Sequence, residues 1–76
     1  MTELVEFLAR ALVDDPDAVR VETEDRDDAL VLHLHVAPDD VGKVVGRQGR
    51  IARALRAVVR AGGVREGRRV LLEIAG

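Results

Sequence analysis

The chain has 76 residues, which suffices for one small domain and leaves no room for a second core. It contains no cysteine, which excludes a disulfide framework and a thiolate metal site. Its longest uncharged stretch, from Ala29 to Pro38, is far too short to span a bilayer. Glu3 and Glu6 also stand where a signal peptide needs a basic and then an apolar run. We therefore expect a soluble cytoplasmic protein without membrane insertion.

The net charge of -2 hides an asymmetry between the two halves of the chain. Residues 1–40 hold twelve acids against three arginines, a balance of -9, and residues 41–76 hold nine bases against two acids, a balance of +7. A polyanion that meets the second half would face a basic surface despite the acidic isoelectric point. Neutralisation between the halves within the molecule is the competing explanation.

The first half predicts a helix followed by a hairpin. Apolar residues at helical spacing indicate a helix from Glu3 to Val13, with Thr2 as its N-cap and Phe7 in the core. Asp14-Asp15-Pro16-Asp17 ends this helix. Alternating residues then predict two antiparallel strands, over 19–24 and 29–36, joined by a polar turn at 25–28. The second strand places Leu30, Leu32, Leu34 and Val36 on one face and Val31, His33 and His35 on the other.

The second half predicts a short helix, a glycine loop, a longer helix and a last strand. Pro38-Asp39-Asp40 opens the short helix, which includes Val41 and cannot run past Gly46. The longer helix spans Arg50 to Ala61, and Gly62-Gly63 is expected to stop it before a strand at 70–74. At 100° per residue this helix has an apolar side of Ile51, Ala52, Leu55, Val58 and Val59, beside a basic column of Arg50, Arg53, Arg56 and Arg60.

The loop Gly46-Arg47-Gln48-Gly49 is the strongest functional signal. Glycines let the backbone turn sharply and approach a ligand closely. The free N–H groups at the start of the following helix attract an anion, and Arg47, with Lys43 and Arg50 nearby, offers charge-assisted hydrogen bonds to phosphate. A tight helix–helix turn with solvated arginines is the plainer interpretation.

The stretch from Val41 to Arg56 resembles the core of a KH domain, an RNA-binding module in which a glycine loop clamps about four backbone nucleotides. The order of the expected elements resembles the bacterial type II KH arrangement, and the resemblance covers essentially all of residues 1–76 as one domain. It implies an α+β fold of order α-β-β-α-α-β, with a three-stranded sheet and helices packed on one face. The chain is similar to the small bacterial stand-alone KH proteins of the KhpA family.

This resemblance implies a binding site for short single-stranded RNA. The loop would contact the sugar-phosphate backbone. An aliphatic wall formed by Val44, Val45, Ile51 and Leu55 would hold the bases, with the edge of the second strand opposite. Arg53 and Arg56 either reach the RNA or only solubilise their helix. Because Phe7 is the only aromatic residue, stacking platforms are lacking and we expect weak binding with a short footprint. The expected RNA-binding residues are Lys43, Val44, Val45, Gly46, Arg47, Gln48, Gly49, Arg50, Ile51, Arg53 and Leu55.

Other classes of function are less well supported by the residue inventory. The sequence offers few candidate catalytic side chains, because serine, cysteine and tyrosine are absent, so an enzyme is not expected. No cofactor is expected either. His33 and His35 share a strand face without a third metal ligand nearby in sequence. A protein-interaction module remains open, with Leu71 or Val31 as an exposed apolar contact. The resemblance further implies a post-transcriptional regulator or RNA chaperone that pairs with itself or with a larger Jag-type KH protein.

Overall fold

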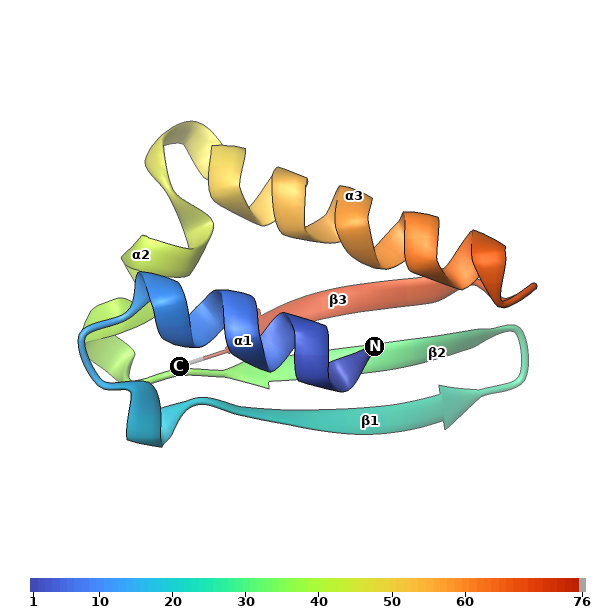
Figure 1. Cartoon of the computed structure of the whole chain (residues 1–76), viewed down its shortest axis with the longest axis horizontal. Helices are drawn as coiled ribbons and strands as arrows, with labels where there is room; N and C mark the ends of the chain where they lie inside the picture. The colour runs from blue at the N-terminus through green and yellow to red at the C-terminus, as the bar shows by residue number, and fades with distance from the viewer. Residues whose placement is uncertain (76) are drawn as a thin grey trace.

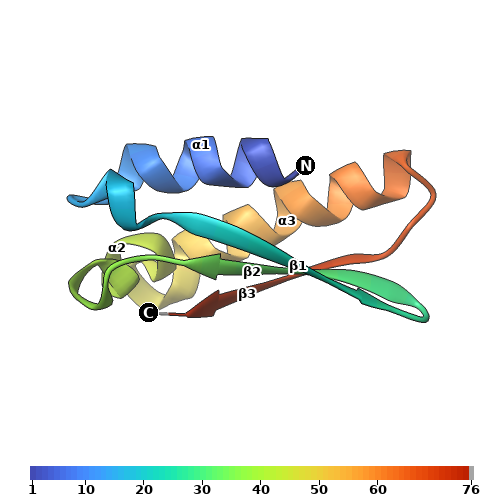
Figure 2. The same cartoon turned by 90° about the horizontal axis from the view of Figure 1, so that it is seen from below.

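Three strands form one sheet, and the helices cover only one of its faces (Figures 1 and 2). The computed structural model describes residues 1–75. Strand order is β1-β2-β3, with β1 antiparallel and β3 parallel to the central strand β2. The expected fold class is confirmed. The elements are α1 (Thr2–Leu12), η1 (Pro16–Ala18), β1 (Arg20–Arg26), β2 (Ala29–His35), η2 (Pro38–Asp40), α2 (Val41–Val45), η3 (Arg47–Gly49), α3 (Arg50–Arg65) and β3 (Val70–Ala75).

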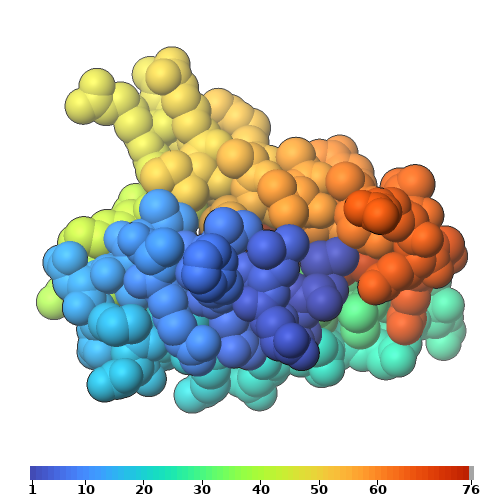
Figure 3. Space-filling model, viewed as in Figure 1, coloured from blue at the N-terminus to red at the C-terminus, as the bar shows by residue number. Residues whose placement is uncertain are grey.

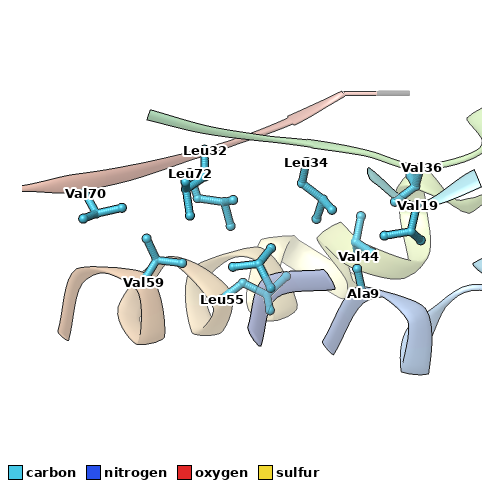
Figure 4. Packing of buried hydrophobic residues seen from close by; sticks show 11 residues of the cluster. Ala9, Val19, Leu32, Leu34, Val36, Val44, Leu55, Val59, Val70 and Leu72 are labelled. Atoms are coloured by element: carbon cyan, nitrogen blue, oxygen red, sulfur yellow. The ribbon is translucent and has the colours of Figure 1, made fainter. Parts of the chain in front are cut away.

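The core lies between the sheet and the helices (Figure 4). Leu32 and Leu34 of β2 are fully buried, which confirms the predicted core face of that strand. Val31, on the opposite face, was expected to be exposed, but it is also fully buried. Its register partners Glu24 and Leu71 lie on the two flanking strands, and such neighbours cover a central position. The sequence pattern identified the core face but not the shielding of the other face.

The orientation of α1 corrects two expectations. Phe7 was placed in the core, yet its exposed fraction is 68%. The buried side of α1 is set by Val5 and Ala9, and Phe7 lies about 200° around the helix from Val5. Thr2 is the first helical residue and makes no capping hydrogen bond, since the N-cap position belongs to Met1.

The longer helix α3 runs four residues further than expected. Gly62 and Gly63 lie inside it, and they serve close packing instead of ending it. A Cβ on Gly62 would overlap the side chain of Met1, and one on Gly63 would overlap the carbonyl oxygen of Arg68. The helix ends at Arg65, and Gly67, whose φ is 72°, turns the chain after it and permits the hydrogen bonds from Arg68 N–H to Gly63 O and from Gly67 N–H to Val64 O.

The end of β1 and the exposure of Val58 also differ from the sequence prediction. Strand β1 continues to Arg26, so the hairpin turn contains only Asp27 and Asp28. Val58 was expected on the apolar side of α3, but it lies at the rim of that side and is 40% exposed. The antiparallel hairpin itself and the end of α2 before Gly46 are confirmed.

Candidate nucleic-acid interface

The loop between α2 and α3 has a backbone that side chains rarely adopt. Gly46 has φ 77° and ψ 173°, and Gly49 has φ 73° and ψ 16°. Gln48 also has a positive φ of 56°, the only non-glycine residue with one among residues 1–75. This segment, drawn in yellow, projects from the rest of the surface (Figure 3). Arg47 and Gln48 are both exposed, so their polar groups are presented to solvent.

The packing of Ile51 explains why the loop begins with glycine. A Cβ on Gly46 would lie 2.6 Å from Cγ1 of Ile51 and 2.9 Å from its Cβ. The first turn of α3 therefore rests directly on the loop backbone. Gly49 differs, because a Cβ there would meet nothing within 4 Å and only the backbone angle favours glycine. This contact gives a physical reason for an aliphatic residue two positions after the loop.

Lys43, expected to bind phosphate, is held by two carboxylates in this structure. Its Nζ lies 2.9 Å from Oδ2 of Asp14 and 3.5 Å from Oδ1 of Asp40. Both contacts raise the pKa of Lys43, the one with Asp14 more strongly. Lys43 must leave these partners, or share its charge with them, before it can neutralise a phosphate group. Sequence analysis missed this contact, although the Asp40–Lys43 spacing of three residues is a signal for a helical ion pair.

Asp40 is the only buried charged residue among residues 1–75, at 3% exposure. Its Oδ2 accepts a hydrogen bond of 3.1 Å from the backbone N–H of Asp15. Burial alone would raise the pKa of Asp40, but the backbone N–H of Asp15 and the ammonium of Lys43 hold it below its usual value. This carboxylate therefore ties the segment after α1 to the start of α2, the helix that leads into the loop.

The arginines of the loop and of α3 are free of ion pairs within residues 1–75, unlike the other bases. Lys43, Arg68 and Arg69 of the second half contact acids of the first half, so the halves neutralise each other in part. Arg10, Arg20 and Arg26 pair with glutamates close in sequence. The arginines without a carboxylate within 4.0 Å are Arg47, Arg50, Arg53, Arg56, Arg60 and Arg65.

The structure narrows the aliphatic wall that was expected beside the loop. Val44 is fully buried and Leu55 is 6% exposed, so both support the loop from within the core and offer no surface to a ligand. Val45 and Ile51 are partly exposed. Of the four expected wall residues, these two have accessible side chains.

The strand edge next to α3 belongs to β3, and the expectation that it belongs to the second strand is wrong. Strand β2 is paired on both sides and has no free edge. Leu30 N–H donates to Arg69 O and Val36 N–H to Ala75 O, so the odd-numbered residues of β3 turn their backbone groups toward β2. Val70, Leu72 and Ile74 therefore turn theirs to the free edge. There Arg56 Nε donates to the carbonyl of Leu72 at 3.3 Å.

The histidines lie on the sheet face that no helix covers. His33 Nε2 is 2.9 Å from Oε1 of Glu24, and its Nδ1 is 3.2 Å from Oε1 of Glu73. Arg26 and then His33 lower the pKa of Glu24. His35 contacts Glu22 at 2.9 Å. No group of three or more His, Cys, Asp or Glu residues suited to hold a metal ion is present within residues 1–75.

Comparison with known proteins identifies this arrangement. A family model described as "KhpA/KhpB, KH domain" matches residues 2–74. The chain belongs to this KH-domain family. The RNA-binding protein KhpA of Halalkalibacterium halodurans is 54% identical over 74 residues, which cover 97% of each chain. That of Caldanaerobacter subterraneus is 50% identical over 97% of this chain and 99% of its own.

A solved structure shares the KH fold at lower similarity. The crystal structure of Aquifex aeolicus Era matches with a TM-score of 0.62 and 20% identity, over 96% of this chain and 28% of that chain. Among residues 1–75, no helix combines the length and apolar character needed to cross a membrane. Three features were not read from the sequence. They are the ion pairs of Lys43, the free edge of β3, and the position of Arg60 and Arg69 beside that edge, where both line a hollow with residues of β3.

Proposed function

We propose that this chain is a single KH unit that binds short single-stranded RNA in the cytoplasm, with the loop as its grip on the backbone. The observation that carries the proposal is the projecting loop, which combines exposed Arg47 and Gln48 with unpaired arginines at the start of α3. Relatives about half identical over nearly the whole chain are named RNA-binding proteins. The proposal assigns no catalytic step and no cofactor to the chain.

Two surfaces would bind different parts of the RNA. Backbone N–H groups around Gly49 and the guanidinium groups of Arg47 and Arg50 suit phosphate oxygens. Val45 and Ile51 form the accessible apolar wall for the bases. Because the free edge of β3 lies along the α3 side of the molecule, its outward backbone groups are the donors and acceptors that suit the edges of unpaired bases. In this role the protein would act as a post-transcriptional regulator or an RNA chaperone.

A matched pair of double variants tests the loop. Arg47→Asp with Gln48→Asp places negative charge against phosphate and keeps both glycines, and aspartate tolerates the positive φ of position 48. The control, Arg20→Asp with Thr23→Asp, makes the same change in net charge at exposed positions of β1, the strand furthest from α3 in the sheet. We expect the loop variant to lose affinity for single-stranded RNA in fluorescence anisotropy while the control retains most of it.

The folded state of both variants is checked by circular dichroism before binding is compared. Equal affinity of the folded loop variant and the parent for RNA would refute the loop assignment. Equal losses in the two variants would show that net charge, and not the loop, governs binding.

A second candidate function is association with another KH chain, either a second copy or a larger Jag-type KH protein. Phe7 and Leu4 favour it, since these large apolar residues lie three positions apart on α1 with exposed fractions of 68% and 44%. Light scattering over a range of concentrations tests self-association, and Phe7→Ser is expected to shift the protein toward the monomer. An unchanged monomeric mass for parent and variant would exclude a homodimer through α1.

A further inference from the structure

The acidic segment that follows α1 contacts the helix that leads into the loop. Asp14 and Asp15 come directly after Val13, the C-cap of α1, where carboxylates face the negative end of the helix dipole. Figures 1 and 2 both show this segment at the same end of the molecule as α2. Lys43 of α2 is the only lysine in the chain, and its Nζ lies 2.9 Å from Oδ2 of Asp14. The ion pair therefore offsets negative charge that the end of α1 disfavours.

The two carboxylates that hold Lys43 differ in burial. The Asp40 side chain is 4% exposed and also accepts the backbone N–H of Asp15, so it keeps one partner when Lys43 moves. The Asp14 side chain is 79% exposed and takes part in no other ion pair within residues 1–75. An exposed carboxylate returns readily to water, and such surface pairs contribute little to stability. Asp14 is therefore the partner that Lys43 can exchange.

Lys43 is accessible and lies close to the loop. Its side chain is 44% exposed. It stands three residues before Gly46, about 4.5 Å along the axis of α2, and its flexible stem lets the ammonium group move between partners. Asp14 and then Asp40 raise the pKa of Lys43, so the ammonium stays charged at neutral pH. A phosphate group at the loop and the carboxylate of Asp14 are therefore two anions within reach of one cation.

We propose that Asp14 competes with the RNA backbone for Lys43, so that the acidic segment after α1 weakens the grip of the loop. The inference rests on the proposed RNA-binding function and adds an intramolecular regulator to that site. In the free protein Lys43 pairs with Asp14, whereas in the complex it pairs with a phosphate and Asp14 is released to solvent. RNA binding and the Asp14 contact each weaken the other by the same factor. Asp14 is thus a positioning residue that acts through Lys43.

A double-mutant cycle on Asp14 and Lys43 tests the competition. Asp14→Asn removes the competing charge, Lys43→Gln removes the contested charge, and the double variant removes both. The control, Asp17→Asn, makes the same change of charge at an exposed residue of η1 that no ion pair within residues 1–75 includes. Affinity for an octanucleotide of uridine is measured by fluorescence anisotropy at several salt concentrations. Circular dichroism and urea unfolding verify the fold of each variant.

Asp14→Asn should bind the octanucleotide about two- to fivefold more tightly than the parent, because an exposed ion pair shifts an equilibrium by up to about fivefold. In the Lys43→Gln background the same substitution should change the affinity by less than about 1.5-fold, since no ammonium group remains to compete for. Asp17→Asn should stay within about 1.5-fold of the parent, because salt screens exposed charges. The slope of log affinity against log salt should be less steep by about 0.7 in Lys43→Gln, as expected for the loss of one phosphate contact.

The outcomes separate this inference from the proposed function. A parent that binds no RNA refutes both. With RNA binding intact, unchanged or weaker binding by Asp14→Asn refutes only the competition. An equal gain from Asp14→Asn with and without Lys43, or an equal gain from Asp17→Asn, would show simple repulsion of the RNA and would also overturn the inference.

A spectroscopic measurement tests the exchange of partners directly. Addition of the octanucleotide should shift the carboxyl carbon NMR signal of Asp14 in the parent, because Lys43 leaves that carboxylate. The signal should stay in place in Lys43→Gln, where the pair is already absent. An unmoved Asp14 signal in the RNA-bound parent would mean that Lys43 keeps its partner, and the competition would then be refuted even if Asp14→Asn binds more tightly.

Discussion

Replacement of Gly46 by alanine tests the physical account of the loop most directly. Its φ of 77° and ψ of 173° fall in a region that is essentially restricted to glycine, and a side chain there costs about 1–3 kcal/mol. The new Cβ would also lie 2.6 Å from Cγ1 of Ile51. Ile51 is β-branched and stiff in a helix, so it cannot turn away freely, and overpacking of this kind costs about 1–3 kcal/mol. We therefore expect a loss of about 2–6 kcal/mol in the free energy of unfolding.

Two other glycines provide matched controls for this measurement. Gly49→Ala meets no atom within 4 Å and carries only the penalty of a left-handed backbone, about 1–2 kcal/mol, reduced by the stiffer unfolded chain. Gly42, in α2, also has open space around it and no positive φ, so Gly42→Ala should stabilise the fold by about 0.5–1 kcal/mol. Urea unfolding followed by circular dichroism gives the order of stability, with Gly42→Ala above the parent and Gly46→Ala lowest.

A double-mutant cycle separates the clash from the backbone strain. Ile51→Ala removes Cγ1 and Cδ1, which would lie 2.6 and 3.0 Å from a Cβ at position 46, and keeps the Cβ of residue 51 at 2.9 Å. Gly46→Ala should therefore cost less in that background, with a coupling of about 1 kcal/mol. Additive effects of the two substitutions would refute the contact between Ile51 and the loop backbone. Similar losses for Gly46→Ala and Gly49→Ala would lead to the same conclusion.

The remaining predictions concern acid stability, the core and the exposed aromatic residue. Because the folded pKa of Asp40 is lowered, its ionised form stabilises the fold fully above the ordinary value of about 3.9 and this contribution is lost as pH falls through the folded pKa. The urea midpoint should therefore fall below about pH 4, and Asp40→Asn should flatten that decline. Val59→Ala should cost about 2–3 kcal/mol in urea unfolding, since Val59 is 1% exposed in the core. Phe7→Ser should change the free energy of unfolding by no more than about 0.5 kcal/mol, because Phe7 is exposed. A larger loss of stability would indicate that Phe7 is buried in the core.

Local patterns predicted most of the fold because each is a direct consequence of helix or strand geometry. The alternation in β2 identified Leu32 and Leu34 as core, since successive side chains of a strand point to opposite faces. The same reasoning failed for Val31 and Phe7. Whether such residues are covered depends on neighbouring strands and on the rotation of α1, and both are set by tertiary packing. The residue pattern within a single helix or strand does not contain that information.

In the candidate site, too, local sequence predicts some features and tertiary packing sets the others. The loop glycines were predictable, because a positive φ has few other solutions than glycine. The state of Lys43 was not, since its partner Asp14 lies 29 positions earlier in the chain and approaches only when the segment after α1 packs against α2. The free edge of β3 likewise depends on the strand order, which a parallel β2–β3 pairing fixes and which hydrophobic alternation does not reveal.

The strand order also explains how a chain of net charge -2 presents a basic surface. Strand β1 carries Glu22, Glu24 and Asp25, and the central strand separates it from β3, the strand that packs against α3. The bases near β1 are paired, whereas those of the loop and α3 are free in residues 1–75. We therefore expect an RNA strand to be repelled by one edge of the sheet and attracted to the other, and screening over about 8 Å at physiological salt reduces the influence of one edge on the other. We accordingly expect RNA affinity to depend on the local density of unpaired arginines and not on the net charge of the protein.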